Sequence, residues 1–113
     1  MLIALDAKIS TTRRIIDADI FFSVKGDNST IIENEIVTEI ELPPMKNNAR
    51  SKFIKFALRK SIDFPIVNCA VALEIDNGAV TSSRICLNAV YNTPYRAISA
   101  EQYLLGKSID DAT

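Results

Sequence analysis

Four basic residues stand close together in the middle of the chain. Lys52, Lys55, Arg59 and Lys60 precede a break at Asp63-Phe64-Pro65, and a long apolar run follows that break. Whether the segment is a strand or a helix, the spacing of Lys55 and Arg59 places their side chains next to each other. The pair either supplies positive charge to a binding site or forms the solvated face of an edge strand.

Residue types that commonly carry catalysis are missing. The 113 residues include no histidine, which removes the usual general base and the catalytic triads that depend on it. The two cysteines lack the C-x-x-C spacing of a metal site. The three glycines are far apart and form no phosphate-binding loop. We therefore predict no catalytic residue and no metal ligand.

Composition narrows the class of protein further. The chain is 48% hydrophobic with a net charge of −1, which indicates one compact domain. A nucleic-acid binder would show a strong basic excess. No apolar run approaches the roughly 20 residues that cross a membrane, and the first ten residues lack the basic lead and cleavage site of a signal peptide. We therefore expect a cytoplasmic protein that binds neither nucleic acid nor membrane.

The C-terminal part of the chain predicts an antiparallel sheet. Its strands are expected at Lys52–Lys60, Ile66–Ile75 and Val80–Val90, although the first of these also fits a helix. Asn77-Gly78 between the last two is the strongest short-range hairpin signal, because both turn positions favour positive φ. Thr93 to Arg96 is expected to leave the sheet.

The hairpin register bears on the two cysteines. If Asn77-Gly78 is a simple two-residue loop, Cys69 lies directly opposite Cys86, and a bulge would break that match. The pair is then either a redox pair or two small core thiols. A cytoplasmic location favours the thiols.

A short helix follows the sheet. Ser99 and Gln102 have the spacing of a capping box, and Gly106 ends the predicted helix. Ser108 to Asp111 then resembles the start of a second helix, which the remaining residues are too few to form. This pattern suggests a fragment or a truncated relative of a longer protein.

The N-terminal part is predicted to be rich in strands. Leu2–Leu5 and Thr11–Ile16 are two expected strands, followed by the apolar cluster Asp17–Phe22 and a turn at Lys25–Asn28. Glu35–Leu42 alternates as a half-buried strand would, with the faces divided as follows: Ile36, Ile40 and Leu42 on one side, Glu39 and Glu41 on the other.

These elements define the fold class. Pro43-Pro44 ends the strand before it, and we place a boundary in the polar linker of residues 45–51. The fold is α+β: a strand-rich N-terminal segment, then a three-stranded antiparallel sheet with a short C-terminal helix. The apolar face of such a sheet needs a cover. We expect a second copy of the chain to provide it in a two-fold homodimer.

Four motifs in order resemble the flavoprotein subunit of the molybdenum hydroxylases, a group that includes xanthine dehydrogenases, aerobic carbon monoxide dehydrogenases and 4-hydroxybenzoyl-CoA reductase. They lie at Ala18–Pro43, Lys52–Leu73, Ser83–Ala97 and Ala100–Asp110. In the family, the first position carries an Asp-x-Phe-Phe start followed by a strand that ends in proline, and the second carries a lysine and an arginine before an aspartate. The third carries a Thr-Pro-x-Arg-Ala segment, and the fourth carries a Glu-x-x-Leu-x-Gly helix. Together they span nearly the whole chain.

The resemblance implies a division into two parts. Residues 1–43 are similar to a remnant of the family's second FAD-binding subdomain. Residues 44–113 resemble the C-terminal domain of carbon monoxide dehydrogenase flavoprotein, truncated at its C-terminal helices. Besides this truncation, the sequence departs from the family in two further ways: it lacks the glycine-rich loop that binds the FAD pyrophosphate, and Asn88-Ala89 stands where a glycine pair is common.

The resemblance also implies a cofactor and two contact positions. The cofactor is FAD, and carried over by motif, the backbone of Val37 and the ammonium group of Lys55 contact the isoalloxazine ring. A cation near the pyrimidine edge stabilises negative charge on the reduced flavin.

The implied role is to relay electrons between molybdopterin and iron–sulfur subunits and an acceptor such as NAD. This chain by itself is not expected to be active, and a complementary FAD-binding chain is a second implied partner. One alternative is a cofactor-free binding or assembly module that kept the fold. An independent small-molecule enzyme is the least favoured interpretation.

Overall fold

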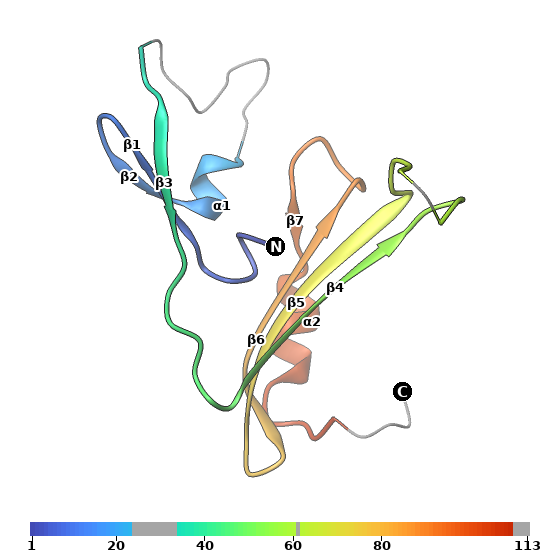
Figure 1. Cartoon of the computed structure of the whole chain (residues 1–113). Helices are drawn as coiled ribbons and strands as arrows, with labels where there is room; N and C mark the ends of the chain where they lie inside the picture. The colour runs from blue at the N-terminus through green and yellow to red at the C-terminus, as the bar shows by residue number, and fades with distance from the viewer. Residues whose placement is uncertain (24–33, 61, 110–113) are drawn as a thin grey trace.

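The computed structural model describes residues 1–23, 34–60 and 62–109, which form two antiparallel sheets and two short helices (Figure 1). The N-terminal sheet has the strand order β2-β1-β3, and the C-terminal sheet has the order β4-β5-β6-β7. The N-terminal elements are β1 (Lys8–Thr11), β2 (Ile15–Asp17), α1 (Ala18–Phe21) and β3 (Val37–Glu41). The C-terminal elements are β4 (Ala49–Phe56), β5 (Val67–Asp76), β6 (Ala79–Asn88), β7 (Tyr95–Arg96) and α2 (Ile98–Leu104).

The start of the chain forms turns, so the predicted strand at Leu2–Leu5 was wrong. The Leu5 amide donates to the Met1 carbonyl at 3.0 Å, and the Ala7 amide donates to the Leu2 carbonyl at 3.0 Å. A short apolar run does not distinguish a buried strand from a buried turn, because both place consecutive apolar side chains against a core. The first strand, β1, begins only at Lys8.

The segment predicted as one strand at Thr11–Ile16 is instead a hairpin turn. β1 ends at Thr11 and β2 begins at Ile15, and the Thr11 amide donates to the Arg14 carbonyl at 2.8 Å. The Thr11 hydroxyl accepts hydrogen bonds from the Arg13 and Arg14 amides, which closes the turn locally. The turn predicted at Lys25–Asn28 lies outside the described residues.

β3 confirms the strand predicted at Glu35–Leu42, with shorter bounds and without a buried face. All five of its residues are exposed, including Val37 and Ile40. The flanking Ile36 and Leu42 are exposed as well. Alternation is typical of a half-buried strand, but no described element covers this face of β3, so the prediction of a half-buried strand was wrong.

The C-terminal sheet has four strands rather than the three that were predicted. Its first three strands were anticipated with shifted ends: β4 runs from Ala49 to Phe56 rather than from Lys52 to Lys60. The fourth, β7, pairs Tyr95 with Leu87 and Arg96 with Cys86, so the prediction that this segment leaves the sheet was wrong. Two paired residues are too few to show a hydrophobic period, which explains why the sequence pattern missed them.

The β5–β6 hairpin turns at Asn77-Gly78 as predicted, with φ values of 49° and 80°. A register shift at Glu74/Ile75 then moves the pairing by one residue, so Cys86 faces Ala70 and Cys69 faces Leu87. Because alternate residues point to opposite faces of a sheet, the two thiols lie on opposite faces. Both cysteines are free. The direct Cys69–Cys86 pairing was therefore wrong, and with it the geometry of a redox pair.

α2 confirms the predicted C-terminal helix but not its cap. The helix begins at Ile98 after Ala97, and no side chain caps its N-terminus, so the Ser99–Gln102 capping box does not form. Gly106 adopts a φ of 77° just after the helix, a left-handed conformation that suits glycine. Ser108 pairs with Ala79 in a bridge instead of starting a second helix, and Asp110 and Asp111 lie outside the described residues.

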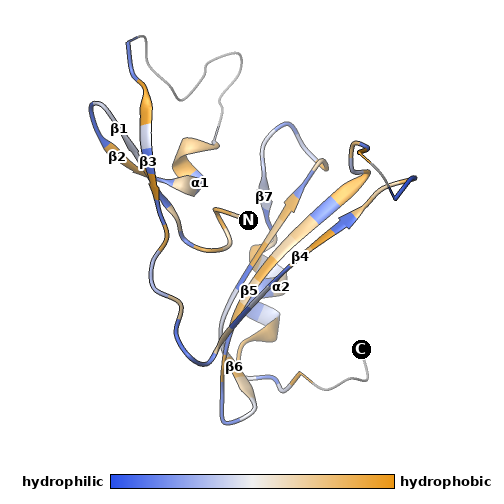
Figure 2. Cartoon of the chain, viewed as in Figure 1, coloured by the Kyte–Doolittle hydropathy of each residue, from blue (hydrophilic) through white to orange (hydrophobic). Residues whose placement is uncertain are grey.

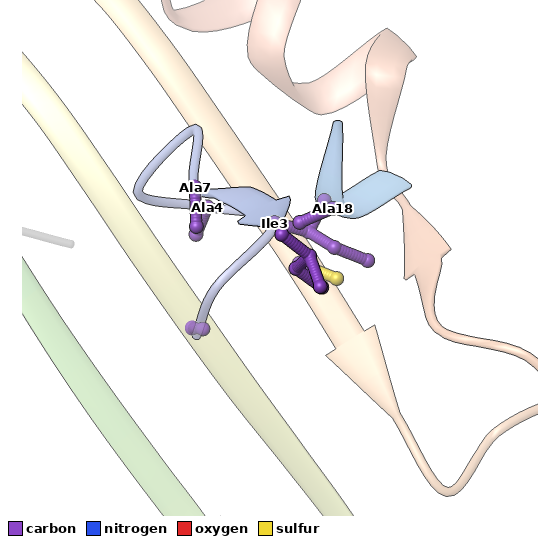
Figure 3. Packing of buried hydrophobic residues seen from close by; sticks show 7 residues of the cluster. Ile3, Ala4, Ala7 and Ala18 are labelled. Carbon is purple, nitrogen blue, oxygen red and sulfur yellow. The ribbon is translucent and has the colours of Figure 1, made fainter. Parts of the chain in front are cut away.

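One small core joins the two parts of the chain (Figure 3). Ala70 of β5 and Cys86 of β6 lie on one face of the C-terminal sheet, where they pack against Ile3, Ala4, Ala7, Ile9 and Ala18 from the N-terminal segment. α2 packs along β6 and lies behind the sheet in the view of Figure 1. Most of the core side chains are alanines, which lets the N-terminal backbone approach the sheet closely.

Ala89 has a conformation that favours glycine, and this gives a stability prediction. Its φ of 68° brings the Cβ close to the following carbonyl group. Ala89→Gly is expected to raise the free energy of unfolding by about 0.5–1 kcal/mol, measured by urea denaturation. Ala100→Gly, within α2, is the control and should lower stability by about the same amount. A lower stability for Ala89→Gly would contradict the assigned backbone strain.

Candidate functional site

Lys55 and Arg59 converge on one residue, Asp63. Lys55 is the penultimate residue of β4, and its ammonium group donates to the backbone carbonyl of Asp63. Arg59 lies beyond the strand, and its Nε donates to the Asp63 carboxylate at 3.0 Å. The hydrogen bond from Arg59 lowers the pKa of Asp63, and the Lys55 charge adds to this effect. The two cations singled out in the sequence are thus joined through the aspartate in the break between β4 and β5.

Val37 is the first residue of β3, which is an edge strand of the N-terminal sheet. Among the described strands β3 pairs only with β1, so its other edge presents backbone amide and carbonyl groups without strand partners. Val37 is 36% exposed. An exposed strand edge of this kind can hydrogen-bond the polar edge of a flat ring.

Val37 and Lys55 lie in different sheets, and the structure does not place them in contact. No Cα atom of β3 lies within 8 Å of a Cα atom of β4. β3 runs down to the linker and β4 runs back up from it in Figure 1, so the start of β3 and the end of β4 both lie far from the linker. A ligand that used both residues would have to span the space between these strand ends.

A pocket of about 340 Å³ lies between the N-terminal segment and the C-terminal sheet. Phe22 and Phe53 form aromatic walls, and the side-chain amides of Asn68 and Asn88 provide polar groups. Sequence reasoning missed both asparagines, because their proximity depends on the register between β5 and β6 after the bulge. The remaining lining residues are Met1, Leu2, Ile3, Cys86 and Pro94.

A second pocket of about 360 Å³ lies at the linker end of the molecule. Two ion pairs are at its walls: Arg84 with Asp6 at 2.7 Å, and Lys46 with Glu74 at 2.9 Å. The first joins the N-terminal segment to β6, and the second joins the linker to β5. They fix the position of the N-terminal part on the sheet at this end.

A buried carboxylate holds β7 and α2 on the sheet. Glu101 is 7% exposed, and it accepts hydrogen bonds from the Ile85 amide at 2.8 Å and from Arg96 Nε at 3.0 Å. Burial alone raises the pKa of Glu101, but the hydrogen bonds from Arg96 and Ile85 and the Arg96 charge outweigh it, so the pKa is lowered. The ion pair is structural, because it links three consecutive elements of the fold.

A similar ion pair organises the N-terminal sheet. Glu35 is 7% exposed and accepts hydrogen bonds from Arg14 Nε at 2.7 Å and from the Thr11 hydroxyl at 2.8 Å. The hydrogen bond with Glu35 raises the pKa of Arg14. This contact ties the β1–β2 turn to the start of β3, and so helps to place Val37.

Within residues 1–23, 34–60 and 62–109, no three His, Cys, Asp or Glu side chains are grouped so that they could hold a metal ion. No helix in the same ranges has the length and apolar character needed to span a bilayer.

Three comparisons with known proteins agree with each other. The chain is 26% identical over 79 residues to the glyceraldehyde dehydrogenase medium chain of Sulfolobus acidocaldarius, which covers 70% of this chain and 27% of the relative. It is 31% identical over 70 residues to a xanthine dehydrogenase FAD-binding subunit of Escherichia coli O157:H7, which covers 61% of this chain and 24% of the relative.

The structural likeness covers more of the chain. A carbon monoxide dehydrogenase from Hydrogenophaga pseudoflava, in a form that lacks the Mo-pyranopterin moiety of the molybdenum cofactor, superimposes with a TM-score of 0.86 at 32% identity. The match covers 97% of this chain and 39% of the dehydrogenase chain. The chain thus spans about a quarter of the length of the curated relatives and about two fifths of the matched structure.

The family profile described as the CO dehydrogenase flavoprotein C-terminal domain matches residues 52–113, which is more than half of the chain. It begins at Lys52, within β4, and extends through α2, so it includes Lys55, Asp63 and the buried Glu101–Arg96 pair. Together with the likeness to FAD-subunit relatives, this match shows that the chain belongs to the CO dehydrogenase flavoprotein C-terminal domain family, within the FAD-binding subunits of the molybdenum hydroxylases.

Proposed function

We propose that the chain acts as part of an FAD-binding subunit that relays electrons between molybdopterin and iron–sulfur subunits and an acceptor such as NAD. The observation that carries this proposal is the likeness of 97% of the chain to a carbon monoxide dehydrogenase chain at a TM-score of 0.86. It favours the flavoprotein role over a cofactor-free assembly module. Bound FAD would supply the electron-carrying chemistry.

The residues present fit one half of FAD. The free edge of β3 and the Lys55 ammonium supply backbone hydrogen bonds and a cation, which suit the polar edge of an isoalloxazine ring. The pyrophosphate has no corresponding glycine-rich loop in these 113 residues. We therefore propose that another segment or a complementary FAD-binding chain binds the pyrophosphate.

Within this proposal, Val37 and Lys55 have different tasks. The Val37 backbone orients the ring through hydrogen bonds from the edge of β3. Lys55 places positive charge near the ring, where it stabilises the negative charge of the reduced flavin and so raises its reduction potential. Asp63 holds Lys55 through its backbone carbonyl, while Arg59 neutralises the Asp63 carboxylate.

Lys55→Ala is expected to weaken FAD binding about tenfold, because it removes one charge-assisted hydrogen bond. Titration of the purified chain followed by flavin fluorescence measures the affinity. Lys52→Ala is the matched control: Lys52 lies on the same strand but points to the opposite face of the sheet, so its loss should leave the affinity unchanged. A midpoint potential of the bound flavin that falls in Lys55→Ala alone would support the electrostatic role.

Two results would contradict the flavin role. If Lys52→Ala weakens binding as much as Lys55→Ala, the effect comes from net charge rather than from a contact. If the wild-type chain binds no FAD either alone or when purified together with its partner subunits, the cofactor role fails.

We propose that the division of the chain follows the two sheets. Residues 1–43 would form the remnant of the second FAD-binding subdomain and residues 44–113 the C-terminal domain. The linker between β3 and β4 supports this division, since it separates the N-terminal from the C-terminal sheet. The cytoplasm is the proposed location, and the two free cysteines support a reducing compartment.

The proposal includes a two-fold homodimer formed through the apolar side of β4. Ile54 is 55% exposed, Phe56 is 60% exposed and Leu58, just beyond the strand, is 85% exposed. Figure 2 shows that hydrophobic residues continue across the neighbouring strand β5. Exposed apolar patches of this kind mark interaction sites.

Sizing with light scattering at tens of micromolar is expected to give a mass twice the 12.5 kDa of the chain. Ile54→Asp should shift the chain to a monomer, because it would place a charge in the interface. Ile15→Asp, at an exposed position of β2, is the control and should leave the dimer intact. A strictly monomeric wild type would refute the dimer.

A further inference from the structure

β3 and β4 each have one edge that pairs with no other described strand. β3 lies at one side of the N-terminal sheet, and β4 lies at one side of the C-terminal sheet. All five residues of β3 are exposed, as are all residues of β4 after Ala49. A free strand edge presents a row of backbone donors and acceptors, which makes it a template for pairing with another strand.

The two free edges carry charges of opposite sign. β3 contributes Glu39 and Glu41, and β4 contributes Arg50 and Lys52. In the part of the chain that the structure describes, none of these four side chains forms an ion pair. The two charges of each strand are two positions apart, so they lie on one face of that strand.

The spacing of these charges fits one antiparallel ladder between β3 and β4. When Glu41 lies opposite Arg50, the opposite direction of the two strands places Glu39 opposite Lys52. Opposite charges at directly opposed positions stabilise a ladder, whereas like charges there destabilise it. A ladder of two β3 strands or of two β4 strands would bring like charges together, so the charges favour β3 with β4.

The backbone of β4 is oriented to accept this ladder. The Ile75 amide of β5 donates to the carbonyl of Asn48, just before β4. Because the backbone groups of alternate residues point to opposite sides of a strand, Arg50 and Lys52 direct theirs toward β5, and Ser51 directs its own to the free edge. In the ladder the two cations therefore occupy non-hydrogen-bonded positions, where opposed side chains approach most closely.

Within one chain the two strands are held apart. No Cα atom of β3 lies within 8 Å of a Cα atom of β4, whereas paired strands lie about 4.8 Å apart. The N-terminal segment packs on the C-terminal sheet through the core of Figure 3, and the ion pair of Arg84 with Asp6 at 2.7 Å joins the two at the linker end. The opposing strand therefore has to come from a second copy of the chain.

We propose that two copies of the chain pair strand to strand, with β3 of each copy added to β4 of the other. Two ion pairs specify the register of each ladder: Glu41 with Arg50, and Glu39 with Lys52. The pairing is reciprocal, so a two-fold axis relates the copies and the assembly is closed. The inference rests on the homodimer proposed above and names the contact that specifies it.

The ladder is compatible with the other contacts proposed for β3 and β4. Ile54 lies on the same face of β4 as Lys52, so the ladder places the second copy beside the apolar side of β4. The register shift of β3 lies between Val37 and Glu39, where it bends the strand and ends regular pairing. The backbone of Val37 therefore stays outside the ladder.

Charge reversal tests the ladder, and analytical ultracentrifugation measures the dissociation constant of the dimer. Glu41→Lys and Arg50→Glu each create two like-charge contacts in a two-fold dimer, so each should raise the dissociation constant about thirtyfold. Asp76→Lys is the matched control, because it changes the net charge as Glu41→Lys does, at an exposed position outside the ladder. It should leave the dissociation constant unchanged.

Two rescue experiments show whether the reversed charges meet. The double variant with Glu41→Lys and Arg50→Glu should return the dissociation constant to within about threefold of the wild type, since both contacts are attractive again. An equimolar mixture of the two single variants should form a heterodimer of similar affinity, because each copy then meets the opposite charge on the other. Lys8 pairs with Glu41 inside the N-terminal sheet, so Glu41→Lys also loosens that sheet. Neither rescue changes Lys8, so recovery of the dimer reports on the ladder alone, and circular dichroism confirms that each variant is folded.

The outcomes separate the ladder from the proposed homodimer. Single variants that dimerise like the wild type would overturn the ladder. Rescue by the double variant but not by the mixture would also overturn it, because the charges would then meet within one chain. A dimer that is lost in Ile54→Asp but unchanged by both charge reversals removes only the ladder and leaves the homodimer standing. A monomeric wild type removes both, whereas the flavin role is judged separately by FAD binding.

Discussion

Glu101→Ala is expected to lower the free energy of unfolding by about 3 kcal/mol, one of the two largest effects predicted for this chain. The carboxylate is buried, and it is bonded to Arg96 and to the Ile85 amide. Removing one partner of such a pair leaves a charge and a backbone donor without partners in a low-dielectric environment. Because the Arg96 side chain keeps 26% exposure, the expected loss lies at the lower end of the range for buried pairs.

Urea denaturation measures this effect, and Gln102→Ala is the matched control. Gln102 is the exposed neighbour on α2, so its substitution should change stability by less than about 0.5 kcal/mol.

The pH dependence of stability gives a second check on the Glu101–Arg96 ion pair. Because the folded-state pKa of Glu101 is lowered, its contribution is complete above the unfolded value of about 4.3 and is lost as the pH falls through the folded value. The difference between the wild type and Glu101→Gln should therefore shrink in acid, and a difference that is constant with pH would contradict the ion pair.

Ile9→Ala is expected to destabilise the protein by a similar amount, about 3 kcal/mol. Ile9 is 2% exposed, and it is one of the two largest fully buried side chains. Its truncation removes apolar contacts and leaves a cavity that the neighbouring alanines are too small to fill. Ile9→Val should cost about 1 kcal/mol, and Ile15→Ala, at an exposed site in the same sheet, should be nearly neutral.

The same variant tests whether the two sheets unfold together. The core of Figure 3 includes residues from both parts of the chain, so Ile9→Ala should lower the denaturation midpoint of the whole molecule in one transition. Tyr95, in β7, and Tyr103, in α2, report on the C-terminal sheet through their fluorescence, while far-ultraviolet circular dichroism reports on both sheets. In Ile9→Ala, part of the circular dichroism signal could be lost at a lower urea concentration than in the wild type while the tyrosine fluorescence transition stays unchanged. That result would show that the N-terminal segment unfolds separately from the C-terminal sheet.

Several features followed from local sequence signals. The Asn77-Gly78 turn, the helix ended by Gly106 and the strands on either side of the hairpin need only neighbouring residues, because turn chemistry and hydrophobic period act over a few positions. The family could also be identified, since the four motifs that carry it are stretches of contiguous residues. Lys55 was found in this way, and Arg59 was recognised as its neighbour.

Tertiary structure decided the features that depend on register and on distant partners. One bulge at Glu74/Ile75 separated Cys69 from Cys86 and placed Asn68 beside Asn88, because a shift of one residue in antiparallel pairing changes every partner beyond it. β7 pairs with β6 through only two residues, which are too few to show the hydrophobic alternation that would predict a strand. Local sequence therefore determined the β5–β6 hairpin, the C-terminal helix and the family, while only the pairing between strands determined β7 and which side chains meet at the candidate site.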